Sequence, residues 1–280
     1  MTTAGGTAVV PARASRGAPP RRGVTYGRVL AGEWTKAVSV PAHLWLALGT
    51  VVAAAGTAYG LGLFIRPDDG RSGSWVLTSG IVLAQMGFLV LGALVGTSDH
   101  TTGTARTTYA AVPRRLPVLG AQVVVTAVVA ALTAAVALAA SYLATAGVRG
   151  ADAPDLDLVV PGTTRALLGF VLLATGVTLL GLGLGALLRR PADAIVTTFV
   201  LVVLADHLLA VQPGRVTDTL RAALPGSGNR LLLDDAAVAA FDGATLGPQL
   251  GVWGGGAVLA AWVAVALAAA AYRLVRHDVR

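Results

Sequence analysis

The feature that most constrains this chain is a series of long apolar segments without charged side chains. Five of them approach or exceed the roughly 20 residues that a helix needs to cross a bilayer. They lie at 44–65, 76–97, 118–147, 166–188 and 251–272. A sixth segment, at 194–211, is shorter and contains Asp206 and His207. We therefore expect an all-α integral membrane protein with six transmembrane helices.

Composition agrees with a lipid environment. Charged residues make up 12% of the chain and hydrophobic residues 55%, whereas soluble domains have roughly 25% charged residues. The apolar segments form a single six-helix transmembrane domain over 24–275. The preceding tail, 1–23, is rich in Gly, Ala, Pro and Arg, which predicts disorder, and 276–280 forms a short cytoplasmic tail. Because the first apolar core begins only at Leu44, we expect that span to be retained and not cleaved as a secretory signal.

The distribution of basic residues predicts the orientation. Cytoplasmic loops of membrane proteins carry an excess of Lys and Arg. Placing the N-terminus in the cytoplasm puts most of the 21 basic residues on the inner side, so both termini are expected to be cytoplasmic. The basic residues are almost all Arg, and Ala, Gly and Val abound, which is typical of a GC-rich bacterial genome. We therefore expect a multi-pass protein of the bacterial cell (inner) membrane.

The segment 24–41 precedes the first span and has a different pattern. Apolar side chains recur at four-residue spacing, whereas Arg28, Lys36 and Ser39 fall on the other side. The apolar set is Tyr26, Leu30, Trp34 and Val38. This pattern predicts an N-terminal amphipathic helix that lies in the membrane interface. The alternative is a partly ordered lead-in to the first span.

On the outer side, the stretch 212–250 is too long for a plain connector. Its apolar parts, 220–224 and 231–241, predict short helices at the outer interface, and the acidic pair Asp234–Asp235 is expected to be solvated. Asp206 is the only carboxylate inside a predicted span, where a charged Asp costs about 2.5–3.5 kcal/mol at the centre. It is either an interfacial residue that stabilises the helix end, or, with His207, a polar point on a substrate path or proton relay.

The main inner loop, 98–117, reads SDHTTGTARTTYAAVPRRLP. The sequence predicts a short helix over 101–111, capped by Ser98 or Thr101 and ended before Pro113. So small and polar a helix cannot bury itself in lipid. It is therefore either solvated or docked against a partner, and composition does not choose between the two.

This loop resembles the one that follows the second span in permease subunits of ATP-binding-cassette exporters of the type-2 class, which is common in actinobacteria. In that family an acidic residue precedes a T-G-T-x-R-x-T core, then a Pro and a basic pair. The matching residues are Asp99, Thr102, Gly103, Thr104, Arg106, Thr108, Pro113, Arg114 and Arg115. The upstream GEWTK, with Glu33, Trp34 and Lys36, is similar to the family's S/A-E-W-T-K lead-in.

The resemblance implies a division of labour. The loop helix would be a coupling helix seated in a separate cassette ATPase subunit, and the lead-in helix would brace that contact. ATP and Mg would be bound by the ATPase and not by this chain, and a second permease copy or a homologue would complete a homo- or heterodimer among membrane lipids. For Arg114 and Arg115, anchoring to lipid headgroups is an equal alternative.

Other function classes find little support in the sequence. The chain has no G-x-x-x-x-G-K-[ST] phosphate loop, no cysteine, no metal-ligand spacing among its 4 histidines, and no basic stripe suited to nucleic acid. Small-xxx-small pairs such as Gly92–Gly96 and Gly181–Gly185 predict close helix packing, in some cases against a second copy. The alternatives to an exporter permease are a proton-coupled secondary transporter that uses Asp206, and an envelope-assembly membrane protein.

Overall fold

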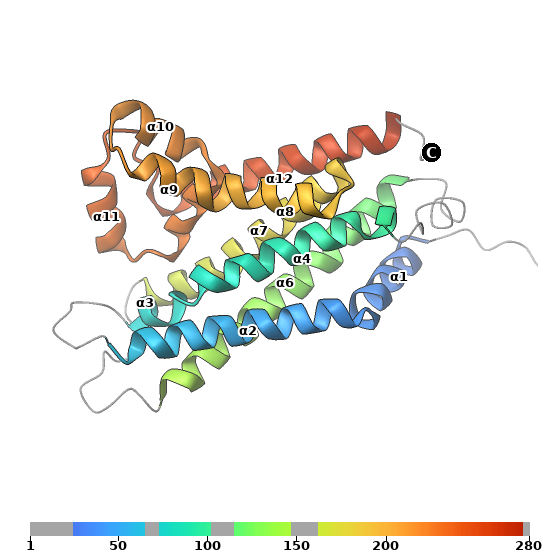
Figure 1. The fold of residues 1–280 in the computed structure, drawn as a ribbon, viewed down its shortest axis with the longest axis horizontal. Coiled ribbons are helices and arrows are strands. Elements are labelled where there is room, and N and C mark those ends of the chain that lie inside the picture. Colours follow the sequence, from blue (N-terminus) through green and yellow to red (C-terminus); the bar gives the residue numbers. More distant parts are fainter. Residues whose placement is uncertain (1–24, 65–72, 102–114, 147–161, 277–280) are drawn as a thin grey trace, which may run out of the picture.

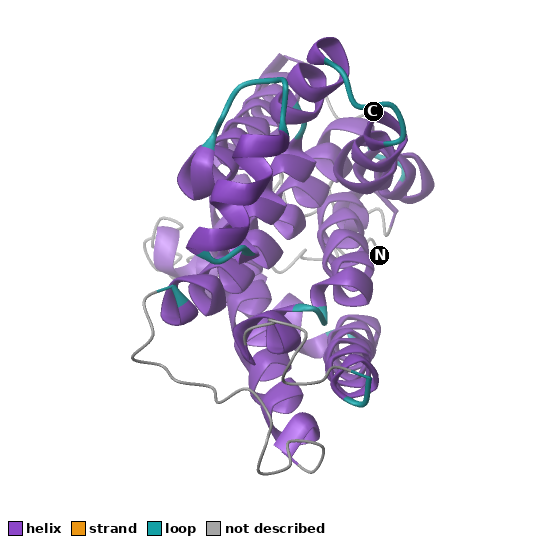
Figure 2. Ribbon diagram, turned by 90° about the vertical axis from the view of Figure 1, so that its left-hand side faces the viewer, coloured by secondary structure: helices purple, strands orange, loops and turns teal. Residues whose placement is uncertain are grey.

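The computed structural model describes residues 25–64, 73–101, 115–146 and 162–276, and within these ranges it is helical and contains no strand (Figure 2). Six of its helices are long and apolar enough to cross a membrane. They are Pro41–Gly62, Gly73–Asp99, Leu116–Ala146, Thr163–Leu188, Pro191–Ala210 and Gly251–Arg276. The predicted all-α membrane fold with six spanning helices is therefore confirmed.

Two of these spans are irregular. The second consists of α3 (Gly73–Thr78) and α4 (Ile81–Thr101), which are separated at Ser79 and Gly80. The fifth consists of α8 (Pro191–Phe199), a π-helical turn η2 (Val200–Leu204) and α9 (Ala205–Ala210). The others are single helices: α2 (Pro41–Gly62), α6 (Arg115–Ala146), α7 (Thr163–Leu188) and α12 (Gly251–Arg276). Thus α4 extends beyond the predicted end of the second span at 97.

The N-terminal part of the described chain begins with α1 (Tyr26–Ser39), which falls inside the predicted amphipathic segment. Pro41 occupies the first turn of α2, a position where proline costs no hydrogen bond and has a suitable φ. Val40, between the two helices, has an extended backbone. This one-residue connection turns the chain, so α1 lies at an angle to α2 at one end of the bundle (Figure 1).

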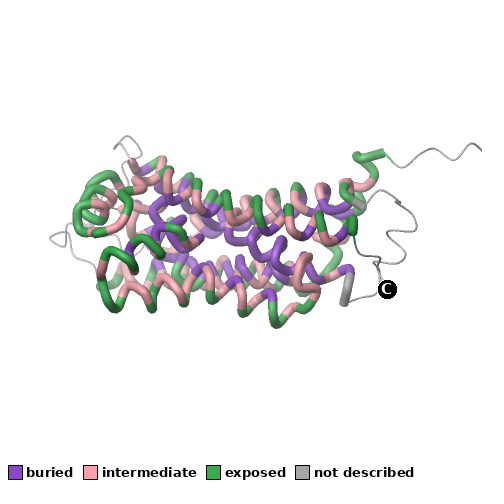
Figure 3. Tube along the Cα trace, turned by 90° about the horizontal axis from the view of Figure 1, so that it is seen from above, coloured by how far each residue is buried: buried purple, intermediate pink, exposed green. Residues whose placement is uncertain are grey.

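Helix α7 is central to the bundle and contacts α4, α12 and α6. Its side chains form much of the core, and Phe170, Leu173 and Leu180 are fully buried there beside Phe88 of α4. Buried residues run along the middle of the bundle, and exposed ones lie outside (Figure 3). The outward side chains of α2 are large and apolar, for example Trp45 at 72% exposure, as expected for a surface that faces lipid.

Four glycines allow α4 and α7 to approach closely. A Cβ on Gly92 or Gly96 would overlap the backbone of α7, and one on Gly181 or Gly185 would overlap that of α4. The predicted close packing at these two pairs is therefore confirmed, and it occurs within one chain. By contrast, a Cβ on Gly56 of α2 would meet no atom of the described chain within 4 Å.

The stretch between the fifth and sixth spans folds into three short helices, which we call the cap: α10 (Arg215–Ala223), the 3-10 helix η3 (Pro225–Leu232) and α11 (Asp235–Ala244). The cap lies at the opposite end of the bundle from α1 (Figure 1). The predicted helical segments are present with different bounds. Asp234 is partly exposed, and its side chain accepts the Ala237 N–H at 2.7 Å and caps α11. Asp235 is exposed and pairs with Arg165.

Candidate functional site

A cluster of polar side chains lies where α1, α4 and α6 meet. The Lys36 Nζ donates to Glu33 Oε1 at 2.7 Å and to Asp99 Oδ1 at 3.3 Å. The amide Nε2 of Gln122, on α6, donates to the other carboxylate oxygen, Asp99 Oδ2, at 2.8 Å. We call these four residues the Lys36 cluster. It ties together three helices whose sequence positions are far apart.

The helical period of α1 explains how this cluster forms. Val29, Glu33 and Lys36 turn toward the bundle at three- and four-residue spacing, and Glu33 is only 8% exposed. On the other side, Tyr26, Trp34 and Val38 remain exposed. The side of α1 that packs on the protein therefore includes Glu33 and Lys36, whereas the aromatic side chains and the polar residues Arg28 and Ser39 remain exposed.

The cluster holds two buried carboxylates against one partly exposed ammonium. Asp99 is 5% exposed, whereas the Lys36 side chain is 42% exposed. Burial raises the pKa of Glu33, despite the opposing hydrogen bond and charge of Lys36. Burial also acts to lower the pKa of Lys36, but Glu33 and Asp99 outweigh it, so that pKa is raised. Lys36 is therefore a firmly charged group that keeps two carboxylates in place.

The structure describes only some of the residues predicted to form the main inner loop. Asp99 belongs to α4 and not to a loop, and Ser98 also lies inside α4, where its Oγ donates to the Val95 carbonyl at 2.8 Å. The proposed N-cap role of Ser98 was therefore wrong, because α4 continues as far as Thr101. Arg115 begins α6. The remaining loop residues lie outside the described residues: Thr102, Gly103, Thr104, Arg106, Thr108, Pro113 and Arg114.

Two residues of this region were not singled out by the sequence. Gln122 was missed because a single amide inside an apolar run has no distinctive spacing. Arg189 ends α7 with a left-handed backbone, φ 62°, and lines a small cavity of about 20 Å³ together with Asp99 and Gln122. In the sequence, the only signal for Arg189 is that it begins the short basic connection between the predicted spans 166–188 and 194–211. Trp34, which the lead-in motif includes, is exposed at 42% and lies outside the cluster.

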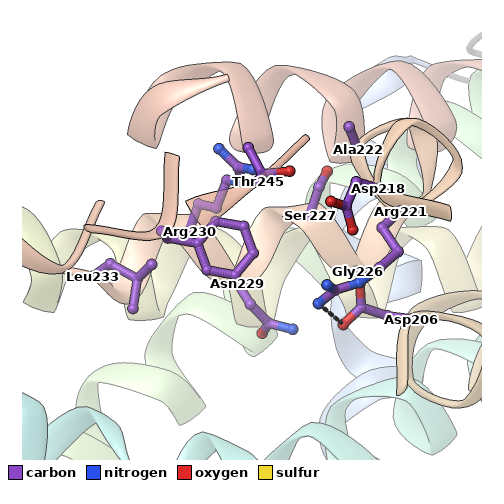
Figure 4. A pocket seen from close by; sticks show the side chains of 11 residues that line it. Asp206, Asp218, Arg221, Ala222, Gly226, Ser227, Asn229, Arg230, Leu233 and Thr245 are labelled. Atoms are coloured by element: carbon purple, nitrogen blue, oxygen red, sulfur yellow. Dashed lines mark hydrogen bonds and ion pairs between the residues drawn. The ribbon is translucent and has the colours of Figure 1, made fainter. Parts of the chain in front are cut away.

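At the cap end, Asp206 is paired with a residue that is distant in sequence. Arg221 of α10 donates from Nε to Asp206 Oδ1 at 3.1 Å and from Nη2 to Oδ2 at 3.4 Å (Figure 4). His207 does not join this pair; its Nδ1 lies 2.8 Å from the Val203 carbonyl oxygen. The arrangement favours the interpretation of Asp206 as a residue that stabilises the end of its helix.

The Asp206–Arg221 pair borders a cavity of about 190 Å³ under the cap. The other charged side chains that line it are also held. Arg230 bonds to Asp242 and lies 4.6 Å from the centre of the Phe241 ring, and Asp218 accepts the Leu246 N–H at 2.9 Å. Because each of these charges has a partner in the cap region or at the end of the fifth span, the cavity walls are best understood as the structure that holds the cap on the bundle.

A search against protein-family models finds no match to this chain, and a search of curated proteins finds none either. Among the described residues, no group of three or more His, Asp or Glu side chains is arranged to hold a metal ion.

Proposed function

We propose that this chain is the membrane-spanning permease subunit of an ATP-driven exporter in a bacterial cell membrane, with both termini in the cytoplasm. The observation that carries the proposal is the contact between Lys36 and Asp99. These residues belong to the two sequence motifs that resemble the exporter family, and 63 positions separate them in the chain. A lead-in helix that braces the coupling loop would need such a contact.

The position of the Lys36 cluster supports a role in transmitting movement. The segment 102–114 connects the end of α4 to the start of α6 in the sequence. Asp99 and Gln122 stand on those two helices, and Lys36 links them to α1. A partner that moves the loop would therefore move three helices as one unit, which is how rigid elements relay a conformational change.

In this proposal the chemistry is divided between subunits. A cassette ATPase binds ATP and Mg and docks beneath 98–117. This chain supplies six spans, and a second copy or a homologue completes the substrate path. The apolar spans suit drugs, lipids and lipopeptides.

The test uses the complex of this chain with the cassette ATPase expected to be encoded nearby. Asp99→Asn and Arg106→Gln should leave membrane insertion and ATP hydrolysis in place but reduce transport about tenfold. The substrate is chosen from the drug-susceptibility profile of a deletion strain. Asp193→Asn is the matched control, because this carboxylate follows the turn at Arg190 and its side chain is 54% exposed. Wild-type transport in both test variants would contradict the coupling role.

The proton-coupled alternative depends on Asp206. Its ion pair with Arg221 gives that carboxylate a structural partner, which makes a proton relay the less favoured proposal. Transport that requires a membrane potential but no ATP would reverse this order.

A further inference from the structure

A third cavity lies between the α2–α4 part of the bundle and the fifth span. It has a volume of about 360 Å³ and is bordered by Leu61, Trp75, Val203 and Leu232, among others. This volume is within the range of pockets that bind small molecules, about 300–1,000 Å³. The described residues that line it include no Asp, Glu, Lys or Arg, in contrast to the charged cavity under the cap. We call it the neutral cavity.

Gln85 of α4 is the distinctive residue of the neutral cavity. It is only 6% exposed, it lines the cavity, and its Nε2 has no hydrogen-bond partner within the described chain. A buried amide without a partner is costly, and native proteins rarely keep one without a reason. A ligand that accepts a hydrogen bond would supply the missing partner.

Other polar side chains of the cavity differ from Gln85. The hydroxyls of Thr78 and Ser79 donate to the carbonyls of Ser74 and Val76 at 2.9 and 2.6 Å. The Nδ1 of His207 is occupied by the Val203 carbonyl. The side chain of Asn229 is only partly buried, and it also borders the charged cavity under the cap. Gln85 is therefore the buried donor that this cavity leaves without a partner.

The backbone around the cavity is irregular on two sides. Ser79 stands at the break between α3 and α4, and Val203 belongs to the π-helical turn η2. Single π-turns inside helices are frequent at functional sites. Within a membrane, departures from regular helix are tolerated where the backbone is buried in protein or lines a cavity. Both irregularities thus coincide with the cavity that contains the unpartnered amide.

We propose that the neutral cavity binds an uncharged, largely apolar molecule through one carbonyl oxygen that accepts a hydrogen bond from Gln85 Nε2. An ion would enter without a counter-charge, which is strongly unfavourable away from water. As a substrate class for export, this inference rests on the proposed permease function. Binding in the neutral cavity needs neither the ATPase nor ATP, so the binding and the permease function can be tested separately.

The experiment uses three photoreactive aryl ketones of the same shape on the purified full-length chain in lipid nanodiscs. Benzophenone is neutral, 4-benzoylbenzoate is an anion, and (4-benzoylbenzyl)trimethylammonium is a cation. After irradiation, mass spectrometry measures attachment to peptides that contain Trp75, Gln85 or Val203. Benzophenone should label these peptides several-fold more than either ion. Preferential labelling by an ion would overturn the neutral class.

Variants then assign the labelling to the cavity. Gln85→Leu keeps a side chain of similar size but removes the donor, and it should reduce benzophenone labelling roughly two- to tenfold, the worth of one net hydrogen bond. Val203→Phe should reduce it by filling space. Thr133→Val is the control, because Thr133 bonds to its own helix at Val129 and does not line the cavity. Equal labelling of wild type and Gln85→Leu would overturn the proposal.

A stability measurement guards against misfolding as an explanation. Because Gln85→Leu removes an unpartnered polar group, its Tm without ligand should equal or exceed that of the wild type while labelling falls. A lower Tm together with lower labelling would contradict the inference.

Competition identifies the source of the carbonyl. Diolein represents a neutral membrane lipid, and progesterone represents a neutral drug-like ketone. Protection by either one supports the neutral cavity and names the source, whereas protection by neither overturns it. ATP-driven transport that persists unchanged in Gln85→Leu and Val203→Phe would overturn the cavity as a substrate site and leave the permease function intact.

Discussion

In the Lys36 cluster, the Lys36 ammonium lies between two buried carboxylates and bonds to Glu33 at 2.7 Å and to Asp99 at 3.3 Å. Lys36→Met keeps the apolar stem and removes the ammonium, so Glu33 and Asp99 would face each other in a poorly solvated position. We expect this variant to lose about 1–3 kcal/mol of stability, as when a buried polar group loses its partner. Thermal unfolding in detergent, followed by tryptophan fluorescence, measures the change.

The matched control for Lys36 is Arg190. It forms a pair with Asp193 at 3.9 Å, and its side chain is 81% exposed. Surface pairs of this kind contribute little, so Arg190→Met should unfold close to the wild-type temperature. An equal loss in both variants would show that the Lys36 cluster has no special weight.

The raised pKa of Glu33 predicts a pH effect with a definite sign. A raised pKa means that the folded state favours the protonated form, so ionised Glu33 costs stability near neutral pH. That cost disappears as the pH falls through the raised pKa toward the ordinary value of 4.5. Lys36, whose pKa is raised above 10.5, stays charged throughout this window. The Tm of the wild type, relative to Glu33→Gln, should therefore rise as the pH falls from about 8 to about 4. A relative Tm that falls over the same interval would refute the assignment.

The sequence motifs identified individual residues of the candidate site, but they did not predict which of these residues contact each other. Lys36 and Asp99 each stood in a motif, but their contact depends on how α1 packs. For Asp206, the sequence offered the adjacent His207 as a partner. Neighbours at i and i+1 point in different directions on a helix, and the actual partner, Arg221, comes from the folded cap. Neither Gln122 nor Gln85 could be recognised in the sequence, because a single amide lowers the mean hydropathy of an apolar run only slightly.

At the scale of helices, the α4–α7 contact gives a sharp comparison between glycines. A methyl group at Gly92 would overlap the Thr178 carbonyl, and the backbone cannot move away as a side chain can. Gly92→Ala should therefore destabilise the protein by about 1–3 kcal/mol, the usual cost of overpacking. Gly56→Ala places the same methyl group in open space and should be neutral or slightly stabilising through helix propensity. Equal unfolding temperatures for the two variants would contradict the close packing.

The sequence was sufficient to predict that the spanning helices exist. It did not predict their breaks, their π-helical turn or their ends. A run of about 20 apolar residues has few solutions in a bilayer other than a spanning helix, so the six spans could be predicted. The break at Ser79 and Gly80 and the π-turn at Val200–Leu204 leave hydropathy unchanged and were not foreseen. The extension of α4 to Thr101 was missed because Ser98 and Asp99 resemble a helix start as much as a helix continuation.

At the scale of the whole molecule, the two ends of the bundle differ in kind. One end carries α1 and the other carries the cap (Figure 1). The Lys36 cluster is at the α1 end, whereas charged side chains of the cap pair with one another and with Asp206 of the fifth span. The excess of Arg in the segments at the α1 end is the basis for placing that end in the cytoplasm. Orientation therefore decides whether the segment 102–114 can meet an ATPase.

Because the chain contains no cysteine, a single thiol introduced at position 104 tests this central claim directly. Thr104→Cys would be expressed with the cassette ATPase in whole cells and treated with a membrane-permeant maleimide that carries a diazirine. On irradiation the diazirine inserts into bonds of whichever chain lies next to position 104, so the partner needs no thiol of its own. We predict a crosslink between the introduced thiol and the ATPase, and no reaction with an impermeant maleimide added outside the cells. Labelling from outside, or an assembled complex in which this thiol forms no crosslink to the ATPase, would contradict the proposed permease.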